Sequence, residues 1–363
     1  MTKTTDETYG GSKYQALLRA DFASFAQHCF RELNPRTLFA SSWHHDIIAA
    51  KLDAVREGRV RGLVINEPPR HLKSHLASVS FPAWRLGHDP SAQILCVSYA
   101  QDLADKLSRD CRQIVASNWY RQLFATRLSA QRQAMSEFET RAQRCRLATS
   151  VGGVLTGRGA DIIIIDDPLK PEEALSQIQR QAANDWFDHT LYSRLNDTRS
   201  GAIILIMHRL HKDDLAGHVL TQEDWEVVRL PAIAGDNETW TLDSELGQYL
   251  LTREHGEALH PERQPLATLD HIRRTIGEYN FAGQYQHMPS PQGGGMVKAA
   301  WFPSYAANGG PTSSTMSCRA GTANKASELS DFSVCTSWGI KGKDLYLLHV
   351  LRRIRCVMWN TCA

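Results

Sequence analysis

The sequence predicts an α/β fold with a mainly parallel sheet that helices cover on both faces. Four short apolar runs, rich in isoleucine, leucine and valine, have the length of strands and show no alternation of polar and apolar positions. Strands that are apolar on both sides are typical of parallel sheets, because crossover helices bury both faces of such a sheet. The four expected strands are Gly62–Asn66, Gln93–Ser98, Asp161–Asp166 and Ala202–Met207.

Helical stretches lie before and between these runs, as a parallel sheet requires. Apolar residues recur at helical spacing from Asp21 to Glu57, and Pro35 interrupts them. Further helices are expected at Asp102–Ala116, Glu172–Leu195 and Leu266–Gln286.

The chain has 363 residues, enough for more than one domain. Residues 1–58 are expected to form an N-terminal helical region, and residues 59–231 the α/β core. Residues 232–295 are polar and irregular apart from one helix, and we expect a subdomain that ends in the glycine-rich linker Pro289–Gly295. The last segment, residues 296–363, is too short to form an independent core easily. Strands are expected in it at Ser333–Trp338 and Leu345–Val350.

Composition indicates a globular protein, because hydrophobic residues make up 42% of the chain. No window approaches the roughly 18 apolar residues of a membrane span, and the first residues carry no apolar segment typical of a signal peptide. We therefore expect a cytoplasmic protein with no membrane partner. The eight cysteines include no CxxC pair and no zinc-finger spacing, so reduced, mostly buried thiols are expected.

The net charge of +2 does not indicate a nucleic-acid partner, but the charge is uneven. Between Asp105 and Arg146 there are nine Lys and Arg residues against four Asp and Glu residues. A local basic surface of this kind could meet phosphates. The alternative is an ordinary solvated helical face, which charge alone favours.

A degenerate phosphate-binding loop follows the first expected strand. Compared with the pattern GxxxxGK[ST], Glu67 and Leu72 occupy the places of the two glycines, and only the Lys73-Ser74 pair remains before a possible helix start. A lysine there neutralises phosphate charge, the serine hydroxyl can hold Mg²⁺, and the amides at the helix N-terminus point at the phosphates. Lys-Ser pairs are common, so this match is weak by itself. The candidate ATP-binding residues are Pro69, Arg70, His71, Leu72, Lys73 and Ser74.

Two carboxylates, Asp166 and Asp167, end the third expected strand. In a P-loop enzyme the first would hold Mg²⁺ together with Ser74, and the second would orient and deprotonate the attacking water. The alternative is a pair of carboxylates that cap the next helix, since Pro168 and Pro171 follow. A strand, a Lys-Ser pair, a helix and then a strand with two terminal carboxylates rarely occur in this order by chance. The order predicts a P-loop NTPase that uses ATP and Mg²⁺.

Two further features fit a nucleotide site. Arg158, with a glycine on either side, is suited to reach a γ-phosphate as an arginine finger, although a plain turn with a surface arginine is the alternative. His208 and Arg209 follow the fourth strand, where ATP hydrolysis can be sensed, and ordinary loop surface is the alternative there. Zinc binding by His208 and His211 would lack an evident third ligand.

Taken in order, these motifs resemble the terminase large subunits of tailed phages and prophages. The segment Pro68–Ser74 looks like that family's variant Walker A motif, and Thr156–Pro168 looks like its arginine-finger turn running into Walker B. Met207–Leu215, which includes His208 and Arg209, is similar to the coupling motif. Phe281–Gln286 resembles the exit from the ATPase region. The resemblance covers nearly the whole chain from about Phe39.

The resemblance implies a motor that translocates double-stranded DNA into a capsid, in the cytoplasm of a bacterial host cell. It implies a homo-oligomer on a capsid portal, with a small terminase subunit as a further partner. It also implies a C-terminal nuclease with an RNase H-like fold, in which an Asp is expected where this chain has Gly321. The residues before Gly321 lack apolar strand character, and the final residues 355–363 look unlike the family. We therefore expect an incomplete nuclease segment without nuclease activity.

Two alternatives to a packaging motor remain. One is a non-packaging prophage remnant that retains only a folded nucleotide-binding scaffold. The other is a P-loop helicase or another DNA-dependent ATPase, although the sequence shows no intact helicase motif beyond Walker B.

Overall fold

The computed structural model describes residues 13–142, 144–244, 247–289, 316–321, 333–341 and 344–353. The chain divides into two compact units, Met1–Gly295 and Met296–Ala363. The larger unit is built on an eight-stranded sheet of order β3-β4-β5-β2-β6-β7-β1-β8, and its strands from β5 to β8 are parallel. The strands of the parallel part are β1 Gly62–Asn66, β2 Ile94–Ser98, β5 Cys145–Ser150, β6 Ile162–Asp166, β7 Ala202–Ile206 and β8 Glu226–Arg229. The predicted α/β class with a mainly parallel sheet is confirmed.

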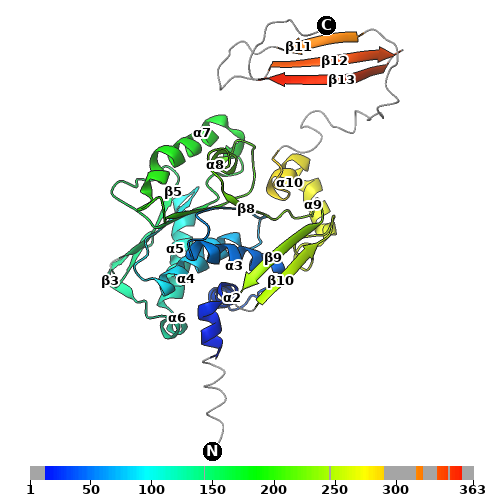
Figure 1. Cartoon of the computed structure of the whole chain (residues 1–363). Helices are drawn as coiled ribbons and strands as arrows, with labels where there is room; N and C mark the ends of the chain where they lie inside the picture. The colour runs from blue at the N-terminus through cyan, green and yellow to red at the C-terminus, as the bar shows by residue number, and fades with distance from the viewer. Residues whose placement is uncertain are drawn as a thin grey trace, which may run out of the picture. The chain divides into compact units, whose positions relative to one another are not determined.

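Helices cover both faces of this sheet (Figure 1). In β6, Ile162 and Ile164 pack into one hydrophobic core, whereas Ile163 and Ile165 pack into the other. Each such fully buried side chain contributes about 1.5–3 kcal/mol relative to exposure. The first core is formed with α2 Phe22–Leu33, α3 Trp43–Arg56, α4 Phe81–His88, α5 Gln101–Ala116 and α6 Asn118–Leu123, and the second with η3 Phe187–Leu191 and α8 Leu215–Val219.

One helical stretch is less regular than its apolar pattern suggests. The expected helix Glu172–Leu195 is a series of short pieces: the 3₁₀ turn η2 Glu173–Leu175, α7 Gln177–Trp186, the π-helix η3, and the 3₁₀ turn η4 Tyr192–Arg194. The helix after the phosphate loop also begins as a π-helix, η1 His75–Ser80, before it continues as α4. π-Helical turns are rare and occur frequently at functional sites.

The sequence did not predict the antiparallel edge of the sheet. Here β3 Leu128–Gln133 and β4 Glu137–Thr140 extend the sheet beyond β5. Both strands are short and rich in polar residues, so they lack the apolar run that identifies a buried strand. The basic stretch from Asp105 to Arg146 is divided among α5, α6 and these strands, and Arg146 is fully buried. The stretch therefore does not form one continuous basic surface.

The prediction that residues 232–295 are irregular apart from one helix was wrong. They contain a hairpin, β9 Glu238–Ser244 and β10 Gly247–Arg253, which has no strongly apolar run. The expected helix is two helices, α9 Leu266–Ile276 and α10 Glu278–Gln284. They separate at Gly277, whose φ of 82° lies in the left-handed region that favours glycine.

The smaller unit contains a three-stranded antiparallel sheet of order β11-β12-β13. Its strands are β11 Met316–Gly321, β12 Ser333–Lys341 and β13 Asp344–Arg353. The residues before Gly321 lack the apolar character typical of a strand, yet they form β11, which pairs along its length with β12. Backbone pairing there does not require apolar side chains. The RNase H-like assignment stays a prediction, and residues 322–332 and 354–363 lie outside the described residues.

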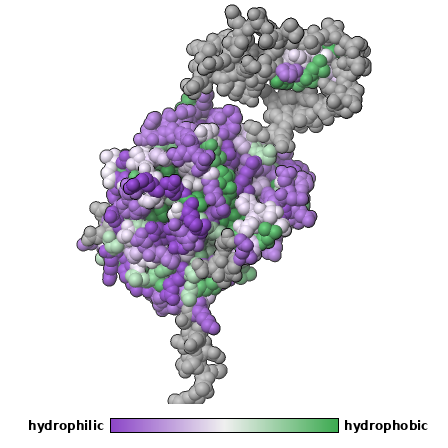
Figure 2. All heavy atoms as spheres, in the orientation of Figure 1, coloured by the Kyte–Doolittle hydropathy of each residue, from purple (hydrophilic) through white to green (hydrophobic). Residues whose placement is uncertain are grey.

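The face of the larger unit in view in Figure 2 is mostly hydrophilic, with apolar patches between the polar residues. None of the helices in the described residues combines the length and the apolar character that a membrane crossing needs. Within that part of the chain, Cys29, Cys96 and Cys111 are buried free thiols, and Cys145 is partly exposed.

Candidate nucleotide-binding site

The loop between β1 and η1 adopts a tight shape without glycine. Arg70 and Leu72 have φ values of 69° and 75°, in the left-handed region that is uncommon for such residues. Leu72 occupies the place of the second glycine in the phosphate-loop pattern. Backbone strain of this kind costs about 1–3 kcal/mol per residue and clusters at ligand-binding segments. His71 is buried, with Nδ1 3.0 Å from the carbonyl oxygen of Pro69, whereas Arg70 is exposed.

The loop lysine contacts the second of the two carboxylates at the end of β6. The ammonium group of Lys73, almost buried, forms an ion pair with Oδ2 of Asp167. The other oxygen, Oδ1, lies 3.3 Å from Nδ1 of His208. The Asp167 backbone is fixed between two strands: its N–H donates to Ile206 at 2.8 Å, and its carbonyl accepts from Tyr99 at 3.1 Å. Its φ of 47° is left-handed, which Asp tolerates better than most residues.

The first carboxylate is buried and accepts two serine hydroxyls. Ser74 Oγ donates to Asp166 Oδ1 at 3.0 Å, and Ser78 Oγ donates to Oδ2 at 2.7 Å. The sequence analysis missed Ser78, although its position four residues after Ser74 puts both hydroxyls on one side of the helix. Hard oxygen donors of this kind suit Mg²⁺, which usually takes one or two protein ligands and completes its shell with phosphate oxygens and water.

Charge and burial set the protonation of the two carboxyl groups. Burial raises the pKa of Asp166. For Asp167, burial also favours the neutral acid, but the nearby charge of Lys73, with His208, outweighs it and holds the pKa of Asp167 well below its usual range. Burial lowers the pKa of His208, so this imidazole is neutral near pH 7. Asp167 is therefore a carboxylate that Lys73 keeps from acting as an effective base.

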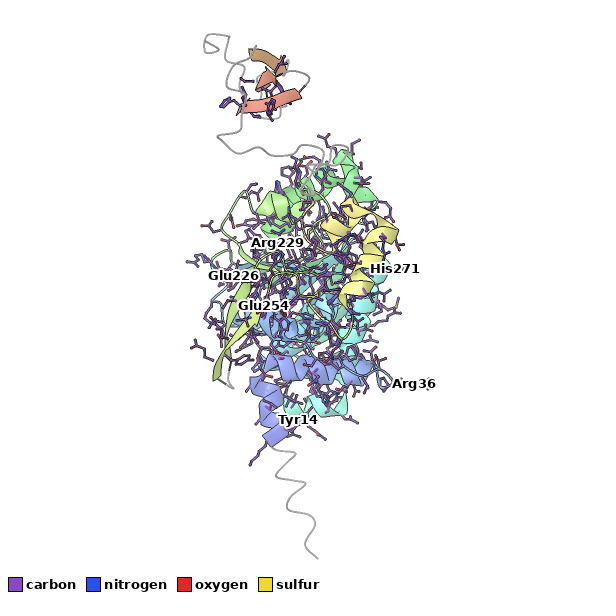
Figure 3. All side chains as sticks on the ribbon, turned by 90° about the vertical axis from the view of Figure 1, so that its right-hand side faces the viewer. Tyr14, Arg36, Glu226, Arg229, Glu254 and His271 are labelled. Carbon is purple, nitrogen blue, oxygen red and sulfur yellow. The ribbon has the colours of Figure 1, made fainter. Side chains whose placement is uncertain are left out.

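The segment after β7 connects the site to the helices that follow the core. Arg209 Nε donates to the buried Asp214 at 3.0 Å, and Asp214 also accepts the N–H of Gly217 at 2.9 Å, which fixes the turn. On α10, a Cβ added to Gly283 would lie 2.9 Å from the carbonyl oxygen of Arg209, so α10 touches this segment directly. Arg229 of β8, labelled in Figure 3, donates to the carbonyl oxygen of His287 at 3.0 Å.

Arg158 does not join this group of residues. Its guanidinium donates two hydrogen bonds to Glu137, at 2.7 and 3.1 Å. Glu137 lies opposite Leu147 on β5. Across the intervening strand β2, Leu147 lies at the same level as Ile163 on β6. Three strand spacings across the sheet and three residues along β6 put the Glu137 backbone about 17 Å from that of Asp166. In this conformation Arg158 is too far from the carboxylates of its own chain to contact a γ-phosphate beside them.

A buried histidine cluster lies behind the loop, and the sequence analysis missed it. His44, His45, His71 and His260 are each almost fully buried, and the ring of His44 lies 4.1 to 5.5 Å from the other three rings. His44 Nε2 is 3.4 Å from Oε1 of the buried Glu67. Burial raises the pKa of Glu67 and lowers the histidine pKa values, to about 3 for His45 and about 4 for His71. The cluster is therefore neutral at pH 7.

No group of three or more His, Cys, Asp or Glu side chains in the described part of the chain is arranged to bind a metal ion. His211, considered above with His208 as a zinc ligand, accepts the N–H of Asp213 through Nδ1 at 3.1 Å.

We expect His45 to make the protein sensitive to acid. Burial holds the pKa of His45 at about 3 in the folded protein, against about 6.5 in the unfolded chain, so the imidazole is neutral in both states above about pH 6.5. As pH falls from about 6.5 to about 3, only the unfolded chain takes up the proton, and the folded state loses stability. His45→Gln should reduce the loss of unfolding free energy between about pH 7 and about pH 5 by about 2 kcal/mol. Urea unfolding at both pH values measures this difference.

The matched control is His271→Gln, which changes an exposed histidine on α9 (Figure 3) and should leave the pH dependence as in the wild type. An unchanged pH dependence in His45→Gln would show that His45 is not buried and neutral in the folded protein.

Comparisons with known proteins return structural similarity without sequence similarity. No protein-family model and no curated protein matches the chain. Solved structures similar to it are large terminases of phages. That of the thermophilic bacteriophage D6E in complex with ADP is 9% identical over 84% of this chain and 67% of the other, with a TM-score of 0.39. The HK97 bacteriophage large terminase is 11% identical over 86% and 64%, with a TM-score of 0.42. An ATPase-domain mutant from Thermus phage P74-26 is 15% identical over 71% and 96%, with a TM-score of 0.41.

Proposed function

We propose that this chain is an ATP-driven DNA translocase of the terminase large-subunit type. The observation that carries the proposal is the meeting of two distant segments, in which Lys73 contacts Asp167 and Ser74 contacts Asp166. A phosphate-binding lysine and a hydroxyl after β1, with two carboxylates at the end of β6, lie at the same edge of the parallel sheet and are the groups that ATP hydrolysis requires. The order of motifs along the sequence, which resembles that of phage terminases, supports the DNA-packaging type.

In the proposed reaction, Lys73 is the group that moves. The β- and γ-phosphates of ATP attract its ammonium group away from Asp167. Once Lys73 leaves, the carboxylate of Asp167 becomes a better base and accepts a proton from the attacking water. Ser74 and Asp166 would hold Mg²⁺, which supplies electrostatic stabilisation of the phosphate charge. His208 keeps Oδ1 of Asp167 in place. The backbone of Arg209, which contacts α10, transmits the movement at the site to that helix.

The position of Arg158 supports a homo-oligomer. Because Arg158 is paired with Glu137 far from the carboxylates of its own chain, we propose that it reaches the γ-phosphate of a neighbouring subunit as an arginine finger. A ring of subunits on a capsid portal, with double-stranded DNA and a small terminase subunit as partners, provides such neighbours. The bacterial cytoplasm is the proposed location of this assembly.

The proposal is tested by steady-state ATP hydrolysis of the purified full chain, with and without long duplex DNA. A translocase should hydrolyse ATP faster when DNA is present, because its ATPase cycle is coupled to movement along DNA. ATP binding together with a hydrolysis rate that DNA does not change would contradict the proposal and favour the non-packaging remnant.

We expect no DNA cleavage by this chain. RNase H-like nucleases place two metal ions between several carboxylates. Gly321, at the end of β11, has no side chain to bind metal where the resemblance implies the first carboxylate. Plasmid incubated with the protein and Mg²⁺ or Mn²⁺ should remain supercoiled. Asp331 is one of the acidic residues that follow Gly321 in the sequence. Metal-dependent nicking that copurifies with the protein and disappears in Asp331→Asn would contradict this expectation.

A further inference from the structure

The arginine finger proposed above has a specific partner in its own chain. Arg158 donates to both oxygens of Glu137, from Nη1 at 2.7 Å and from Nη2 at 3.1 Å. The Glu137 side chain is 14% exposed and that of Arg158 is 39% exposed, so the carboxylate is the more firmly packed partner. Two-point pairing of guanidinium and carboxylate fixes the orientation of both groups.

The strands around Arg158 are packed in the sheet, so the side chain of Arg158 can move without displacing them. Glu137 lies on β4, which the fully buried Phe138 anchors to the core. The segment that carries Arg158 is tied to neighbouring strands at both ends: the N–H of Val151 donates to Ser98 at 2.9 Å, and the N–H of Asp161 donates to Gln93 at 2.8 Å. A turn of the side-chain torsions could release the guanidinium without moving the fold.

The two acceptors compete for the same donors. With one N–H of Nη1 and one of Nη2 bound to Glu137, the end of the guanidinium that would hold a phosphate with two parallel hydrogen bonds is occupied. We propose that Glu137 is the positioning residue that holds Arg158 away from phosphate until the nucleotide site of a neighbouring copy displaces it. This inference rests on the proposed function, in which Arg158 acts as an arginine finger.

The strength of the pair fits a reversible contact. Ion pairs at partly exposed positions are weak, because water screens them. The phosphates of ATP with the metal site of a docked neighbour offer a stronger electrostatic partner. The Glu137–Arg158 pair thus competes with the phosphates of a neighbouring copy, and it lowers the fraction of docked copies in which Arg158 is released to act.

The test compares Glu137→Gln with the wild type in steady-state ATP hydrolysis of the full chain with duplex DNA. The amide keeps the size of the side chain but removes its charge. We expect kcat to rise about twofold to fivefold, with KM for ATP unchanged, because weakening a pair of this exposure shifts the population of released Arg158 by about that factor. Glu139→Gln, two residues along β4, is the matched control and should leave kcat unchanged.

A second comparison separates this role from a merely structural one. In an Arg158→Ala background, adding Glu137→Gln should have no effect on kcat, since the residue it restrains is gone. A fall in kcat in Glu137→Gln, an unchanged kcat, or a rise that persists without Arg158 would each overturn the inference. In all three cases the proposed function would stand as long as duplex DNA accelerates ATP hydrolysis by the wild type and Lys73→Ala abolishes that hydrolysis. Absence of hydrolysis in the wild type would contradict the proposed function itself.

Discussion

Replacing Lys73 by alanine is expected to weaken ATP binding by at least about 30-fold, because removing one partner of a buried charge interaction costs about 2–5 kcal/mol. The side chain is 7% exposed and points to the carboxylate pair at the end of β6. Its loss would leave two adjacent acids facing the triphosphate with no compensating cation. Calorimetric titration with Mg²⁺·ATP measures the effect.

Lys51→Ala is the matched control for this substitution. Lys51 also pairs with a carboxylate, that of Glu226, but on the half-exposed surface of α3 and β8. It should therefore leave ATP affinity unchanged. Because removing Lys73 from a buried pair could also destabilise the fold, thermal melting of each variant accompanies the titration. A folded Lys73→Ala variant with undiminished binding would rule out this loop as the nucleotide site.

Replacing Asp167 by asparagine is expected to reduce turnover by at least about 100-fold while ATP binding is retained, since a general base contributes roughly 10²–10⁴-fold. Asparagine has the same shape and tolerates the left-handed backbone with φ of 47°, so the loop should not rearrange. Without the negative charge, Lys73 is free to contact phosphate, so ATP affinity should be at least that of the wild type. Single-turnover hydrolysis, with binding measured separately, resolves the two effects.

Asp270→Asn provides the control for this change, because Asp270 lies on α9 and its side chain is 57% exposed. It should hydrolyse ATP at the wild-type rate. If Asp167→Asn retains normal turnover, another group must activate the water, and the proposed role of Asp167 is wrong.

The sequence was informative where a single physical signal dominates. The isoleucine run of β6 faces two cores at once, and only a buried parallel strand accounts for such a run, so the central strands could be predicted. The two acids after it and the Lys73-Ser74 pair could be linked because the carboxyl ends of parallel strands meet at one edge. The polar strands β3, β4, β9 and β10 carry no such signal.

Other features of the site depend on tertiary contacts. Leu72 has a left-handed backbone at a position where the phosphate-loop pattern requires glycine. The conformational preference of leucine alone argues against this conformation. The partnership of Arg158 with Glu137 joins residues from different elements, as does the cluster of His44 and His260. No spacing rule connects such residues, because their proximity is a result of the sheet order and the packing around it.

The most direct test of the central claim is an experimental structure of the chain with Mg²⁺ and a non-hydrolysable ATP analogue. We expect Lys73 to leave Asp167 and contact the β- and γ-phosphates, while Ser74 and Asp166 lie at the metal. We also expect Asp167 and His208 to face the γ-phosphate. A nucleotide bound elsewhere, or a bound nucleotide beside which Lys73 still pairs with Asp167, would contradict this assignment of the nucleotide site.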